Sequence, residues 1–102
     1  MSREREIAVA VMQLASTRST GLATYSRCYA ELPNFIEFTA AERKLSPTRP
    51  GEPIWHQFVR NIRSHYETDG NFIERGLLRH VPRVGYLLTK KGRLWLENPH
   101  AG

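Results

Sequence analysis

The stretch from residue 47 to residue 66 constrains this chain most, because a Pro/Gly-rich loop there runs into a strongly two-sided helix pattern. We predict a helix over residues 53–66. Pro53 stands at the first helical position, where a missing N–H costs no hydrogen bond, and Glu52 before it meets the positive end of the helix dipole. At about 100° per residue, the apolar side chains fall on one face. They are Ile54, Trp55, Phe58, Val59, Ile62 and Tyr66.

The opposite face of this predicted helix is polar and carries no carboxylate. Its side chains are His56, Gln57, Arg60, Arg63 and Ser64, with Asn61 and His65 at the edge. A charged helix face is often only a solvated surface, but such faces normally mix acidic and basic residues. Amides pair with the adenine edge, and arginine with the guanine edge, in the major groove of DNA. This face is therefore predicted to read bases.

Length and charge limit the possible folds and partners. A length of 102 residues supports one hydrophobic core, so residues 1–102 are predicted to form a single domain. The formal net charge of +5 favours a polyanionic partner, and most of the basic residues are arginine, which binds phosphates through paired hydrogen bonds. No apolar run approaches the roughly 20 residues of a membrane-spanning helix, and no signal-peptide pattern follows the start. We expect a cytoplasmic protein that does not associate with membranes.

Pattern analysis along the rest of the chain predicts several short elements. Ser2, Thr24 and Thr89 stand where helix caps are expected, and Thr39 with Glu42 forms a capping-box pattern. Two short runs rich in apolar residues, joined by Pro82-Arg-Val-Gly85, predict two strands near the C-terminus. The elements are a helix over residues 2–15, an extended piece at 22–24, helices over 24–32 and 39–45, strands over 77–81 and 86–89, and a last helix from 89 to 98.

Cys28 is the only cysteine, which excludes an internal disulfide and a thiolate zinc site. It lies at helical spacing from Tyr25, Tyr29 and Leu32. We therefore predict that Cys28 fills space in the core and is not a nucleophile.

The order of these elements predicts an α+β fold of the winged helix-turn-helix type. Such a fold would have three main helices, a two-stranded wing and a short C-terminal helix. The helix over residues 53–66 would enter the major groove, and the basic hairpin would reach phosphates or the minor groove. Every charged residue from Arg79 to Arg93 is basic, so the hairpin and its flank are predicted to grip the DNA backbone.

The predicted DNA contacts form two groups. Those predicted to read bases are Trp55, His56, Gln57, Arg60, Asn61 and Ser64. Those predicted to contact the backbone are Arg49, Arg63, Arg79, Arg83, Lys90 and Lys91.

Some of these assignments leave alternatives open. Trp55 suits the core as well as a base stack, and Arg49 suits an ion pair with Glu52 as well as a phosphate. We expect His65 and Asn71 to tie the helix end to the following turn by hydrogen bonds, in preference to contacting DNA.

Short motifs spread over residues 5–97 carry a resemblance to a known family. The motifs are Pro50-Gly-Glu-Pro-x-Trp55, Trp55-x-x-x-Val59-Arg-Asn-Ile-x-Ser-His65, Gly70-Asn, Gly76-Leu-Leu, Gly85-Tyr-Leu-Leu-Thr89 and Gly92-Arg93. With them the chain resembles the winged-helix domains attached to modification-dependent restriction endonucleases, including HNH-type nucleases and, more distantly, Mrr-type amino-terminal domains. The resemblance implies a sensor of modified double-stranded DNA, with N6-methyladenine in GATC-like sites favoured over modified cytosine. It also implies a nuclease domain elsewhere in the parent protein.

The chain itself shows no pattern of a catalytic or metal-binding set. An HNH nuclease needs a metal-binding histidine, a general-base histidine and a positioning asparagine in a ββα arrangement. The four histidines here do not make that set, because His56 and His65 are predicted on one helix, His80 on a strand and His100 in the C-terminal tail. A carboxylate–lysine nuclease pattern, a phosphate-binding glycine loop and a Ser-His-Asp order are all missing. Residues 67–71 supply only a fragment of a calcium loop. We expect no enzymatic activity, no metal and no cofactor.

Two other functions stay open on the sequence alone. A transcription-regulator-like winged helix that reads unmodified DNA shares every feature described above. A protein-interaction module would bind DNA weakly and without steep salt dependence, and the basic run from Arg79 to Arg93 argues against it.

Overall fold

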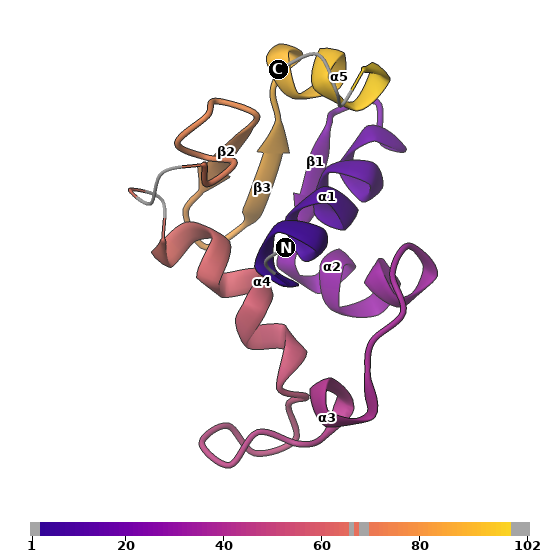
Figure 1. Ribbon diagram of the computed structural model, residues 1–102, viewed down its shortest axis with the longest axis vertical. Coiled ribbons are helices and arrows are strands. Elements are labelled where there is room, and N and C mark those ends of the chain that lie inside the picture. Colours follow the sequence, from indigo (N-terminus) through magenta and orange to yellow (C-terminus); the bar gives the residue numbers. More distant parts are fainter. Residues whose placement is uncertain (1–2, 66, 68–69, 99–102) are drawn as a thin grey trace.

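The computed structural model describes residues 3–65, 67 and 70–98 (Figure 1). Within these residues the chain is an α+β fold with five α-helices and one three-stranded antiparallel sheet. The elements are α1 (Arg3–Ser16), β1 (Leu22–Thr24), α2 (Tyr25–Glu31), the 3-10 helix η1 (Leu32–Asn34), α3 (Ala40–Arg43), α4 (Trp55–Ser64), β2 (Leu78–Val81), β3 (Gly85–Leu88) and α5 (Lys90–Glu97). None of these helices is long and apolar enough to cross a membrane.

Side-chain caps fix where several of the helices begin. Thr24 accepts a hydrogen bond from a backbone N–H in the first turn of α2, and Thr89 does the same in α5. Thr39 and Glu42 form a reciprocal capping box at the start of α3. These caps satisfy backbone donors that have no partner within the helix, and they confirm the predicted starts. Ser2, the predicted cap of the first helix, lies outside the described residues.

The predicted hairpin of β2 and β3 is confirmed, but the prediction of a two-stranded wing was wrong in strand number. The sheet has the order β1-β3-β2, because the extended piece at residues 22–24 pairs with the free edge of β3. An unpaired strand edge leaves backbone N–H and C=O groups without partners, and β1 supplies them. Gly85 permits the close approach of these strands, since a β-carbon there would lie 2.2 Å from the Ala23 carbonyl oxygen.

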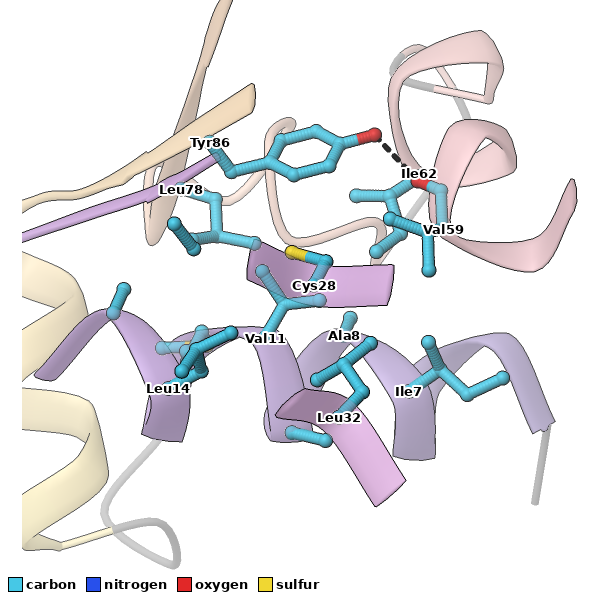
Figure 2. Packing of buried hydrophobic residues seen from close by; sticks show 14 of the residues in the cluster. Ile7, Ala8, Val11, Leu14, Cys28, Leu32, Val59, Ile62, Leu78 and Tyr86 are labelled. Atoms are coloured by element: carbon cyan, nitrogen blue, oxygen red, sulfur yellow. Dashed lines mark hydrogen bonds between the residues drawn. The ribbon is translucent and has the colours of Figure 1, made fainter. Parts of the chain in front are cut away.

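The core is built on α1, which contacts α4, the sheet and α5. Its side chains Ile7, Val11 and Leu14 are fully buried, as their helical spacing predicts. Cys28 lies in the middle of the same cluster (Figure 2), and this confirms its predicted core position. Burial raises the pKa of the Cys28 thiol to about 12. The thiol is therefore protonated at neutral pH and serves as packing.

Tyr86 of β3 joins the sheet to α4. Its side chain is completely buried, and its hydroxyl donates a hydrogen bond to the Val59 carbonyl at 2.6 Å (Figure 2). The same hydroxyl accepts a hydrogen bond from the Arg63 backbone N–H at 3.1 Å. Burial is the main cause that raises the pKa of Tyr86, so the phenol stays a neutral donor. Contacts to two successive turns of α4 fix the orientation of this helix against the hairpin.

The helix predicted over residues 53–66 is shorter in the structure, because α4 begins at Trp55 and ends at Ser64. Pro53 instead pairs with Leu45 in an isolated antiparallel bridge, which keeps Pro53 in the loop. The same bridge explains why the helix predicted over residues 39–45 ends earlier than expected. Tyr66 lies outside the described residues.

We expect Tyr86→Phe to lower the free energy of unfolding by roughly 1–3 kcal/mol, because it leaves the Val59 carbonyl and the Arg63 N–H without their buried partner. Urea unfolding followed by circular dichroism measures the change. Val84→Ala, at an exposed side chain in the turn of the same hairpin, is the control and should stay within about 0.5 kcal/mol of the wild type. Equal stability of Tyr86→Phe and wild type would contradict the linking role of this hydroxyl.

Candidate nucleic-acid interface

Helix α4 presents one buried apolar face and one accessible polar face. The buried side chains are Trp55, Val59 and Ile62. The exposed or half-buried polar side chains are His56, Gln57, Arg60, Asn61, Arg63 and Ser64. The two faces predicted from the sequence are confirmed, although the surroundings of Trp55 and Arg60 differ from the prediction.

Trp55 belongs to the core. Only 4% of its surface is exposed, and its ring stacks on Phe38 with a centroid distance of 4.3 Å and an interplanar angle of 15°. A base could stack on Trp55 only if Phe38 moved away. The base-reading role predicted for Trp55 therefore does not fit the structure, whereas the alternative core position does.

Arg60 is part of a hydrogen-bonded network and is not a free cation. Its Nη1 donates a charge-assisted hydrogen bond to Oε1 of Glu52 and lies 3.3 Å from the Tyr29 hydroxyl. Hydrogen bonding to Arg60 holds the pKa of Glu52 below its ordinary value, so this carboxylate is charged at neutral pH. The prediction of a face without any carboxylate was therefore wrong at this point.

The place of Glu52 and Tyr29 in this network was not predicted from the sequence, because neither residue lies on α4. A helical projection of residues 53–66 cannot include a side chain from the preceding loop or from α2. The loop backbone brings Glu52 back to the helix: the Ser46 N–H donates to the Glu52 carbonyl at 2.7 Å, and the Ile54 N–H donates to the Lys44 carbonyl at 2.8 Å. Such pairing across a loop has no periodic signal in the sequence.

His56 lies in the same network and packs α4 against α2. Its ring stacks on Tyr29 with a centroid distance of 3.9 Å and an interplanar angle of 12°, and its Nδ1 is 3.7 Å from Oε1 of Glu52. Burial lowers the pKa of His56, although the nearby Glu52 carboxylate opposes this shift. The imidazole is neutral at pH 7 and adds no charge to the polar face. Its predicted contact with a base stays a prediction.

A cleft of about 670 Å³ lies between the end of α4 and strand β2. Among the described residues, its lining is Arg63, Ser64, Ile73 and His80. Burial and the nearby Arg63 lower the pKa of His80. Arginine, imidazole and hydroxyl groups with one apolar side chain, and no carboxylate among these described residues, suit an anionic or polar ligand.

All six residues predicted to contact the DNA backbone are exposed, but they lie in different parts of the fold. Arg49 is in the loop before α4, Arg79 is on β2, and Arg83 is in the turn of the hairpin. The backbone of Arg83 has a φ of 66°, a conformation that few non-glycine residues adopt. Because Tyr86 ties the hairpin to α4, Arg79 and Arg83 have a fixed place relative to Arg63 of that helix.

Lys90 and Lys91 belong to another region. They open α5, which follows the end of β3 that leads away from the hairpin turn (Figure 1). The four residues of β3 span about 13 Å at the usual rise of a strand. A DNA duplex that contacts α4 and Arg83 would therefore contact Lys90 and Lys91 only at a position farther along the duplex.

His65 and Asn71 stabilise the end of α4. Asn71 donates from Nδ2 to the Ile62 carbonyl at 3.0 Å, and its Oδ1 accepts from the Ile73 N–H at 2.7 Å, which confirms its predicted tie between helix and turn. His65 lies 2.8 Å from Glu4 of α1 through its Nδ1. The predicted tie of His65 to the turn is therefore replaced by a tie to α1.

Comparisons of the chain with family models, curated proteins and solved structures found no match. No three histidine, cysteine or carboxylate side chains in the described part of the chain lie close enough together to hold a metal ion. These comparisons therefore supply no function for this surface.

We expect the thermal stability of the protein to fall as the pH is lowered from about 7 to about 5.5. The pKa values of His56 and His80 are both lowered in the folded state, so the unfolded chain binds these protons more readily. Their contribution to stability is present above the unfolded pKa of about 6.5 and is lost as the pH falls through the folded values.

Calorimetry of the wild type and of a His56→Gln/His80→Gln variant tests this linkage. The variant should lose most of the change in melting temperature across that pH range. A wild-type melting temperature that stays constant or rises as the pH falls would show that the two imidazoles are not buried as described.

Proposed function

We propose that this chain is a winged-helix DNA-binding domain in which α4 enters the major groove. The observation that carries the proposal is the polar face of α4, which offers amide, hydroxyl and guanidinium groups beside a hairpin that bears Arg79 and Arg83. An α-helix fits the major groove, which is about 12 Å wide, and these groups match the hydrogen-bonding edges of the bases. The order α1, β1, α2, α4, β2, β3, with β3 between β1 and β2, also supports a winged helix.

The charge of the chain supports the same partner. The net charge is +5, and Arg49, Arg63, Arg79 and Arg83 are exposed around α4 and the hairpin. In this proposal these arginines contact phosphates and set the position of the duplex. Gln57, Arg60, Asn61 and Ser64 are then the side chains that contact base edges.

We propose further that the duplex carries a modified base, with N6-methyladenine in GATC-like sites favoured. This step rests on the resemblance to sensors of modification-dependent restriction endonucleases and on the amides of Gln57 and Asn61, which suit an adenine edge. The burial of Trp55 removes it as an apolar wall for the methyl group. Phe58, which is half-buried on the same helix, takes that place in the proposal.

Cleavage of DNA, in this proposal, is carried out by a nuclease domain of the parent protein. The chain would then act as the part that selects the target. A regulator that reads unmodified DNA would use the same helix and the same hairpin. The two functions differ in the ligand, so a comparison of ligands distinguishes them.

We expect a fully methylated GATC duplex to bind more tightly than a hemimethylated one, and the hemimethylated one more tightly than an unmethylated one. A fully buried methyl group contributes about 0.8 kcal/mol, so two methyl groups would give a preference of roughly tenfold. Fluorescence anisotropy competition, with 5-methylcytosine and 5-hydroxymethylcytosine duplexes of equal length, measures this order. The affinity for every duplex should fall steeply with salt.

The other outcomes separate the alternatives. A preference for modified cytosine would keep the sensor and replace the base. Equal affinity for all duplexes would favour a regulator of unmodified DNA. Weak binding with a flat salt response would contradict DNA binding altogether.

A further inference from the structure

We infer that Arg60 reads a guanine and that Glu52 is the positioning residue that holds the guanidinium for this contact. The inference rests on the proposed DNA-binding function and specifies what the target site contains. Its basis is the way in which the guanidinium of Arg60 is held.

Within the described part of the chain, Arg60 makes two side-chain hydrogen bonds, and both use the same nitrogen. Nη1 donates to Glu52 and to the Tyr29 hydroxyl, which leaves the edge formed by Nη2 and Nε available as a pair of parallel donors. Guanine presents two acceptors, O6 and N7, side by side in the major groove. An arginine that offers two fixed donors on one edge matches this pair of acceptors, whereas adenine offers one acceptor and one donor there.

Glu52 can hold Arg60 in place because its own backbone is anchored. The Glu52 carbonyl accepts from the Ser46 N–H at 2.7 Å, and the Glu52 N–H donates to the Arg49 carbonyl at 3.2 Å. The next residues are fixed by the bridge between Leu45 and Pro53. The carboxylate is therefore presented from a closed loop and does not depend on a flexible segment.

Tyr29 fixes the other side of the guanidinium. Its ring is covered by the His56 ring at 3.9 Å and meets the buried Trp55 edge-on at 6.2 Å. Arginine has many rotamers, and a side chain that is already fixed loses less conformational freedom when it binds. Glu52 and Tyr29 together thus prepare Arg60 for one geometry of contact.

The carboxylate of Glu52 also affects selectivity. A free arginine on this face would bind any phosphate of any sequence. With Glu52 beside it, the local charge is neutral and phosphate gains little, whereas the hydrogen bonds to guanine depend on donor geometry. Glu52 should therefore weaken binding to unrelated DNA and strengthen discrimination at one base pair.

The test begins with selection of bound duplexes from a random pool by the wild-type chain. We expect one position to be enriched in guanine, and 7-deazaguanine at that position, which lacks N7, to weaken binding by roughly 5- to 100-fold. Inosine keeps O6 and N7 and should bind as well as guanine. Arg60→Ala should remove the preference at this position only.

The role of Glu52 is tested with Glu52→Gln, which keeps the shape and removes the charge. We expect the preference for guanine at that position to fall about fivefold or more, while binding to an unrelated duplex stays equal or becomes tighter. Tyr29→Phe should reduce the same preference by a smaller factor. Glu97→Gln, which removes the same charge from an exposed site at the end of α5, is the matched control and should leave the preference unchanged.

The outcomes distinguish this inference from the proposed function. If no duplex binds the wild type at low salt, both are overturned. If duplexes bind but Glu52→Gln keeps the full guanine preference, or loses preference equally at all positions, only the role of Glu52 is overturned. Circular dichroism of each variant shows that the fold is retained, so the loss can be attributed to the contact.

Discussion

The hydroxyl of Tyr86 is the contact on which the proposed interface depends most. It donates to the Val59 carbonyl and accepts from the Arg63 N–H, so one buried group of the sheet holds two turns of α4. The hairpin that carries Tyr86 also carries Arg79 and Arg83. The same contact therefore sets the distance between the helix proposed to read bases and the residues proposed to bind phosphates.

The loop before α4 also determines the charge on the polar face of the helix. Its backbone pairing delivers Glu52 to Arg60, and stacking of His56 on Tyr29 closes the network toward α2. The polar face of α4 thus has one part with a paired cation, at Arg60, and another part with the exposed neutral side chains of Gln57 and Ser64. In the proposed complex these parts would differ in role, with selectivity at the first and adaptable hydrogen bonds at the second.

Much of the fold could be predicted because its signals are local. Thr24, Thr39 and Thr89 cap the helices that follow them, and these caps need only the next three residues. The third strand and the Glu52–Arg60 pair could not be predicted in the same way, because both join segments that have no periodic relation in the sequence. Trp55 shows a related limit: its position at the border of the apolar stripe fits either face, and only the stacked Phe38 decides it.

Chemical-shift mapping of the isotope-labelled chain during titration with a short duplex tests directly whether α4 and the hairpin form the DNA-binding surface. We expect the largest amide shifts at Gln57, Asn61 and Ser64 on α4 and at Arg83 in the hairpin turn, while Glu97 at the end of α5 is unchanged. The largest shifts on α1 or α5, with α4 unaffected, would contradict this expectation.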